Sequence, residues 1–124
     1  MAKPWTEKQL ATSLDKIRSI CLALPEAEEE LTWETTITFR IRKKIFCFPG
    51  DGGSLTVKAE EDEFGPLMED SRFTIPPYLS RGNWVRMDLQ AASVDWTEVR
   101  ELIHTAYVLI APKRLAAQVE SAAG

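Results

Sequence analysis

The spacing of apolar residues changes twice along the chain, and this change most constrains the fold. Near the amino end, apolar residues recur at alternating intervals of four and three, as on one face of an α-helix: Leu10, Leu14, Ile17, Cys21 and Leu24. Over 36–42 the interval becomes two, which is the period of a half-buried β-strand. Helical spacing returns over 96–110. Helices at both ends of a strand-rich centre predict an α+β domain.

Local signals set the limits of the outer helices. Thr6 and Gln9 have capping-box spacing, and Pro25 cannot continue a helix, so the first helix is predicted over 7–24. Asp95 and Glu98 repeat the capping-box spacing at the start of the last helix, which Ala111-Pro112 ends.

The central strands are predicted as an antiparallel meander. The first strand, 36–42, turns at 42–44 into a second at 45–48 that is apolar on both faces. Residues 49–53 have strong turn chemistry and lead into a third strand over 55–59. The acidic segment 25–33 is expected to be irregular.

Two further strands and a short helix complete the predicted order. Residues 60–70 suggest a short helix whose main body starts near Pro66, followed by strands at 73–75 and 83–89. The order α-β-β-β-α-β-β-α predicts a two-layer sandwich, mostly antiparallel, with helices on one face and the other face partly open. We expect one domain over 1–114 and a flexible or frayed helical tail over 115–124.

Composition limits the partners. The 124-residue chain carries a net charge of −4, which disfavours a protein that coats DNA unless its positive charge gathers on one face. No apolar run is long enough for a membrane span, and the amino end does not resemble a signal peptide. We therefore expect a cytoplasmic protein with no membrane partner, monomeric rather than dimeric.

Several segments resemble the MmcQ/YjbR family of small bacterial proteins. The resemblance runs from about Leu14 to Arg114, and its most specific part is the run Pro77-Tyr78-Leu79-Ser80-Arg81-Gly82-Asn83-Trp84-Val85. Lys44-Ile45-Phe46 and Thr105-Ala106-Tyr107 add to it, although the family usually has Ser-Tyr at the latter. The resemblance implies a fold akin to secretion chaperones and loosely to frataxin. It also implies DNA binding, a label that the family owes to its fold.

A set of basic residues is the first candidate site. Arg40, Arg42 and Lys58 share the outward parity of neighbouring strands, Arg86 is expected to join them, and Lys43 and Lys44 lie in the adjacent turn. A positive sheet face could hold a phosphate backbone. The alternative is a solvated polar face whose cations pair with nearby carboxylates.

The second candidate is the loop that leads into the last strand. Tyr78, Arg81, Asn83 and Trp84 could clamp an anionic or planar ligand, with Trp84 as a stacking surface. The alternative is that Tyr78 and Trp84 close one end of the core.

No enzyme, cofactor or metal site is predicted. Glu60, Glu61, Asp62 and Glu63 fit the start of a helix better than a cation cage, and Cys47 is expected to be buried and inert. His104 lacks an obvious catalytic partner.

Three functions remain open at this point. The first is a non-catalytic DNA-binding protein that uses the basic sheet face. The second is a protein-interaction or chaperone-like module that uses the same face or the edge at 76–78. The third is a binder of small anionic ligands around Arg81 and Trp84.

Overall fold

A computed structural model describes residues 4–32, 36–50, 52–77, 79 and 81–123. In chain order the elements are α1 (Glu7–Leu22), β1 (Glu28–Thr32), β2 (Thr36–Ile41), β3 (Lys44–Gly50), β4 (Ser54–Lys58), α2 (Glu61–Met68), β5 (Phe73–Thr74), β6 (Trp84–Asp88), α3 (Trp96–Ile110) and α4 (Lys113–Ala123). Within these ranges no helix is both long and apolar enough to cross a bilayer.

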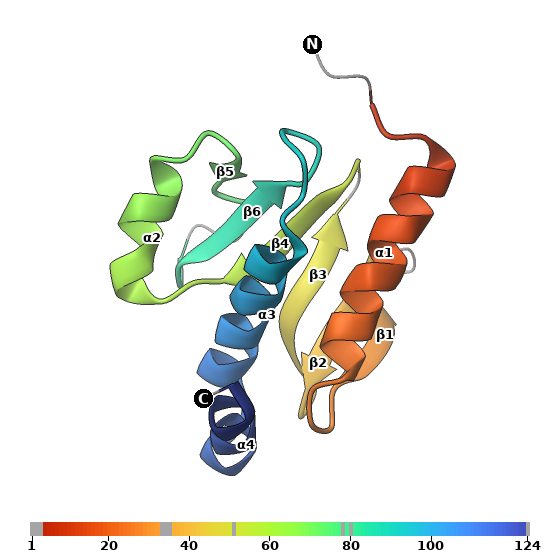
Figure 1. Cartoon of the computed structure of the whole chain (residues 1–124). Helices are drawn as coiled ribbons and strands as arrows, with labels where there is room; N and C mark the ends of the chain where they lie inside the picture. Colours follow the sequence, from red (N-terminus) through yellow and green to blue (C-terminus); the bar gives the residue numbers. More distant parts are fainter. Residues whose placement is uncertain (1–3, 33–35, 51, 78, 80, 124) are drawn as a thin grey trace.

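The strands form one sheet of six in the order β1-β2-β3-β4-β6-β5, and every neighbouring pair is antiparallel. Helices α1 and α3 lie on one face of this sheet (Figure 1). Helix α2 flanks strand β5, and α4 packs on α3 (Figure 1). The predicted α+β sandwich, with its helices on one face, is therefore confirmed.

Side-chain caps begin both long helices where the sequence indicated. The Thr6 side chain accepts a hydrogen bond from the Gln9 backbone, and the Gln9 side chain accepts one from the Thr6 backbone at 2.8 Å. The Asp95 carboxylate caps α3 by accepting from the backbone N–H groups of Thr97 and Glu98. These caps satisfy amide groups that have no partner within the helix.

The acidic segment 25–33 was expected to be irregular, and this prediction is wrong for residues 28–32, which form the edge strand β1. Glu28 to Leu31 are all exposed, so no alternation of apolar and polar residues marks the strand. Two of its glutamates form ion pairs: Glu29 pairs with Arg18 of α1, and Glu30 pairs with Arg40 of β2. Pairing with β2 and these ion pairs explain a strand that the apolar pattern does not predict.

A bulge in β3 explains why this strand is apolar on both faces. Phe39 pairs with Cys47 while Arg40 pairs with Ile45, so Phe46 is the extra residue. Both Phe46 and Cys47 are fully buried in the core. The bulge thus places two consecutive side chains of β3 in the core.

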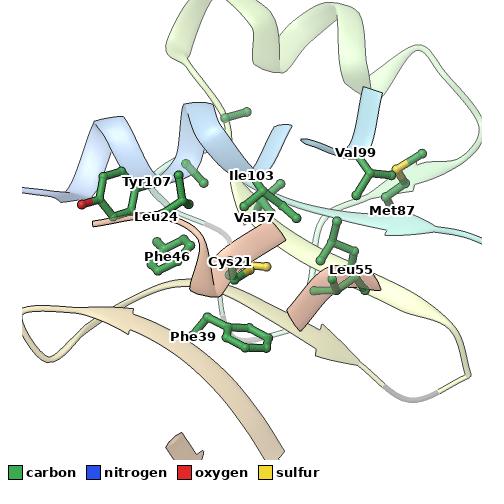
Figure 2. Close-up of a cluster of buried hydrophobic side chains, with 14 of the residues drawn as sticks. Cys21, Leu24, Phe39, Phe46, Leu55, Val57, Met87, Val99, Ile103 and Tyr107 are labelled. Carbon is green, nitrogen blue, oxygen red and sulfur yellow. The ribbon is translucent and has the colours of Figure 1, made fainter. Parts of the chain in front are cut away.

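The main core lies between α3 and the middle of the sheet (Figure 2). Helix α3 contributes a stripe of buried residues, Val99, Ile103, Ala106 and Tyr107, which packs on β3 and β4. The ring of Tyr107 meets that of Phe46 edge to face, with 5.4 Å between ring centroids. Cys21 of α1 reaches the same core. Burial and the neighbouring Cys21 thiol raise the pKa of Cys47, which keeps this thiol protonated.

One hydrogen bond joins α3 to the turn after α1. The Tyr107 hydroxyl donates to the backbone oxygen of Pro25 at 2.6 Å. Glu26 follows in the left-handed region, with φ at 58°. The Tyr107 side chain is fully buried, so its hydroxyl fixes the path between α1 and β1 rather than pointing into water.

Two helices differ from expectation. Helix α2 begins at Glu61 and not near Pro66, which lies inside it, because the acidic residues occupy its first turn. Residues 113–123 form the regular helix α4, whose Leu115 and Val119 are buried against the core. The domain limit at residue 114 stays a prediction.

Arg72 links the segment after α2 to α3. Its guanidinium donates to both carboxylate oxygens of Glu98, at 2.8 and 3.1 Å, and contacts Asp70 at 2.7 Å. These hydrogen bonds lower the pKa of Asp70. The Glu98 side chain therefore pairs with Arg72 and does not complete the predicted capping box with Asp95.

We expect Tyr107→Phe to destabilise the protein by about 1–2 kcal/mol, because the Pro25 carbonyl loses its donor while ring packing persists. Tyr107→Leu also removes the contact with Phe46 and should cost more. Urea unfolding followed by circular dichroism measures both. Equal stability of wild type and Tyr107→Phe would contradict the role given to the hydroxyl.

The Asp70 pair predicts acid sensitivity. The pKa of Asp70 is lower in the folded protein than in the unfolded chain, where it is about 3.9. The stability that the Asp70–Arg72 pair contributes is therefore complete above pH ~3.9 and is lost as the pH falls through the lower, folded pKa. Asp70→Asn should therefore flatten the fall of stability over this acidic range. Asp62→Asn is the control, since Asp62 has no basic partner in the described chain. Parallel pH profiles for Asp70→Asn and wild type would rule the pair out.

Candidate nucleic-acid interface

The sheet face opposite α1 and α3 carries the residues that alternate with the core residues. Phe48, Thr56, Arg86 and Thr74 lie in one row across β3, β4, β6 and β5, as the strand register shows. Lys58 and Trp84 form the next pair along the same face. We call this surface the helix-free face; its members used below are Arg40, Phe48, Lys58, Trp84 and Arg86.

Arg40 lies on this face but is held by neighbours. Its guanidinium pairs with Glu30 at 3.1 Å and donates to the hydroxyl oxygens of Thr32 and Thr38, at 2.8 and 3.3 Å. It also donates to the backbone oxygen of Lys43. With 21% of its side chain exposed, Arg40 acts mainly within the fold.

Lys58 and Trp84 lie together near the start of β6. They are direct cross-strand partners, so their side chains share a face. A Cβ atom at Gly82 would lie 3.3 Å from the Lys58 ammonium and 3.5 Å from the Trp84 indole. Gly82, with φ at 84°, thus leaves space for both groups. The Trp84 side chain is half-buried.

Arg86 follows Trp84 by two residues and points to the same face. It lines a hollow of about 380 Å³ together with Thr74 and Asp88. Among the described residues neither Arg86 nor Lys58 forms an ion pair. The structure therefore places two cations without an ion pair in the described chain on the same sheet face as one indole: Lys58 directly across from Trp84, and Arg86 two residues along the same strand.

The other three predicted cations lie at the hairpin between β2 and β3. The outward parity predicted for Arg42 is wrong, because β2 ends at Ile41 and Arg42 begins the turn. Arg42 and Lys43 adopt left-handed conformations, with φ at 51° and 68°. Arg42 pairs with Glu26 at 3.0 Å, while Lys43 and Lys44 are exposed.

The loop before β6 is only partly described. Tyr78 lies outside the described residues, and Arg81 is exposed. Asn83 has φ at 60°, and its backbone oxygen accepts a hydrogen bond from the Ala59 backbone N–H at 2.9 Å. The clamp of Tyr78, Arg81, Asn83 and Trp84 stays a prediction.

Sequence reasoning missed the apolar part of the helix-free face. Phe48 is half-buried and lies opposite Thr56, which separates it from Arg86 in the same row. Ile45 is also half-buried and lies opposite Arg40. The signal was available, since a strand that is apolar on both faces must present some of those residues to the open side.

The acidic residues near α2 and His104 were the remaining candidates. Among the described residues no group of three or more acidic, histidine or cysteine side chains is arranged to hold a metal ion. The acidic residues near 60–63 start α2. Burial, followed by the charge of Arg100, lowers the pKa of His104.

Stability measurements should distinguish Arg40, which is hydrogen-bonded within the fold, from Arg86, which forms no ion pair among the described residues. Arg40→Ala removes hydrogen bonds to two threonines and one backbone oxygen, so we expect a loss of about 1–2 kcal/mol. Arg86→Ala should change stability by less than about 0.5 kcal/mol. Thermal unfolding of both variants measures the difference, and the reverse order would contradict the assignment.

Comparison with known proteins places this geometry in a family. The YjbR family model matches residues 22–109. The crystal structure of Deinococcus radiodurans protein DR2400, which has a DUF419 domain, superposes with a TM-score of 0.72. The two chains are 19% identical, and the match covers 86% of this chain and 87% of that one, so it shows a shared fold. Curated proteins gave no sequence match. Since the family model spans well over half of the sequence, the chain belongs to the YjbR family.

Proposed function

We propose that this protein is a non-catalytic nucleic-acid-binding domain that uses its helix-free face. The observation that carries the proposal is the pair of cations, Lys58 and Arg86, that lack an acidic partner among the described residues and share the helix-free face with Trp84. Cations provide phosphate contacts, and the ring face of a partly exposed indole provides a surface on which a base can stack.

The mixture of aromatic and basic residues favours a single strand. Phe48 and Trp84 are half-buried on the same face as the cations. Unpaired bases can stack on such rings, whereas a duplex keeps its bases inside. Because Arg40 pairs with Glu30, Lys58 and Arg86 are the two cations named on the helix-free face that lack an ion pair among the described residues.

Two such cations imply weak salt dependence. Two phosphate contacts on a single strand predict a slope of about −1.4 for log K against log salt. Raising salt from about 50 to 200 mM should therefore reduce affinity by about sevenfold. A protein that coats DNA with many cations would lose far more.

The test uses a fluorescein-labelled oligothymidine and fluorescence anisotropy at several salt concentrations. Lys58→Ala and Arg86→Ala should each weaken binding and make the salt slope shallower by about 0.7. Trp84→Ala should weaken binding by about tenfold or more with an unchanged slope, because stacking carries no net charge. Lys113→Ala, an exposed residue of α4, is the matched control.

Three results would count against the proposal. The first is that no binding to oligothymidine is measured at low salt, and the second is that its affinity does not change with salt concentration. The third is that Lys113→Ala reduces the affinity as much as Lys58→Ala does. Tight duplex binding with no single-strand binding would overturn the preference for unpaired bases.

A protein-interaction module is the second candidate, favoured by edge strand β1. Its Leu31 is 65% exposed, the highest value among the large apolar side chains described. The free backbone edge of such a strand can pair with a strand of a partner protein, and an exposed apolar side chain can contact that partner. A photo-crosslinking amino acid at position 31 should then give a discrete protein adduct in cells, and the same probe at position 58 should not.

A further inference from the structure

The groove between α1 and α3 is a separate feature, on the side of the sheet opposite the helix-free face. It consists of two adjoining hollows of about 390 and 450 Å³, which share Thr12, Lys16 and Trp96. Both volumes fall within the range of small-ligand sites. We call this the α1–α3 groove.

Positive charge dominates the α1–α3 groove. Lys8, Lys16 and Arg100 line it, and none of them forms an ion pair among the described residues. Asp15 is the acidic residue in the described lining, and its carboxylate contacts Arg18 at 2.7 Å. The three cations therefore lack a fixed counter-charge in a protein whose net charge is −4.

Two tryptophans form the walls. Trp96 is half-buried, and the Lys16 ammonium lies 5.1 Å from the centre of its ring. Trp5 is held in place, since its backbone N–H donates to Gln90 and its ring lies 2.9 Å from where a Cβ of Gly53 would stand. Because helix α3 starts at Trp96 and is capped by Asp95, the second wall is fixed as well.

We propose that the α1–α3 groove binds a small ligand in which an anionic group adjoins a planar ring, the chemistry of a mononucleotide. The ammonium and guanidinium groups would neutralise the anion, and the indole rings would stack against the planar part. Ser19 and Ser93 line the same groove, and their hydroxyl groups can serve as further hydrogen-bond donors. The Thr12 hydroxyl already donates to the backbone oxygen of Lys8, so it can only accept from a ligand.

The arrangement differs from an ordinary solvated helix surface in two respects. On such a surface, lysines alternate with acidic residues that pair with them. Here Asp15 pairs with Arg18, and the three cations instead line hollows that are also lined by Trp5 and Trp96. Lys16 lies over the Trp96 ring.

Isothermal titration with three probes tests the proposal: adenosine monophosphate, inorganic phosphate and adenosine. We expect the monophosphate to bind at least about tenfold more tightly than either of the other two, since it alone engages both cations and rings. Lys16→Gln and Arg100→Gln should each weaken binding of the monophosphate by about tenfold. Trp96→Leu should weaken binding of the monophosphate and leave the affinity for inorganic phosphate unchanged.

Controls separate this site from the helix-free face. Lys58→Gln should leave binding of the monophosphate unchanged, while Lys16→Gln should leave binding of oligothymidine unchanged. Circular dichroism and thermal unfolding establish that each variant is folded before titration. If Lys16→Gln alone fails this check, Arg100→Gln still provides the test.

Three outcomes would overturn the proposal. The monophosphate does not bind at millimolar concentration, it binds no more tightly than phosphate, or Lys16→Gln and Arg100→Gln bind it as wild type does. If Lys58→Gln instead abolishes binding, the ligand occupies the helix-free face and the α1–α3 groove is not the site.

Discussion

The packing of α3 across β3 and β4 organises the rest of the molecule. Val99, Ile103 and Tyr107 are fully buried on one side of this helix, and the sheet supplies Leu55 and Val57 beneath them (Figure 2). Burial of this apolar seam is the largest source of stability available to a domain of this size. With α3 fixed there, α1 covers the strands towards β1, and α2 flanks the opposite edge (Figure 1). One face of the sheet is therefore covered by helices, and the other is left to polar and aromatic side chains.

The incomplete cover of the sheet creates both candidate sites. On the helix-free face, Lys58 and Arg86 lie beside Trp84. On the other side, α1 and α3 pack mainly on the strands, and the α1–α3 groove remains between them. Other acidic residues lie in β1 and in the first turn of α2, while Asp88 lines the same hollow as Arg86. A protein of net charge −4 can thus still offer cations without ion pairs at two places on its described surface.

Much of the fold could be predicted because its signals are local. The capping residues Thr6 and Asp95 mark helix starts, since a side chain there bonds amides only two or three positions away. Alternation over 36–41 marks β2 because every second side chain enters the core. Strand β1 has no such pattern, since an edge strand with exposed glutamates is stabilised by pairing with β2 and not by its own burial. The bulge at Phe46 is hidden for a similar reason, because it exists only relative to the neighbouring strand.

Sequence patterns alone were enough to predict α1, α3 and the alternation of side chains within β2, β4 and β6, which includes the outward positions of Arg40, Lys58 and Arg86. Which of these cations lack an ion pair depends on the folded structure. Arg40 and Arg42 are neutralised by Glu30 and Glu26, residues of a segment that sequence patterns do not place. The α1–α3 groove likewise joins residues from helices at opposite ends of the chain. Helix caps and strand periods depend on near neighbours along the backbone, whereas ion pairs and grooves depend on contacts between distant segments, which the folded core alone fixes.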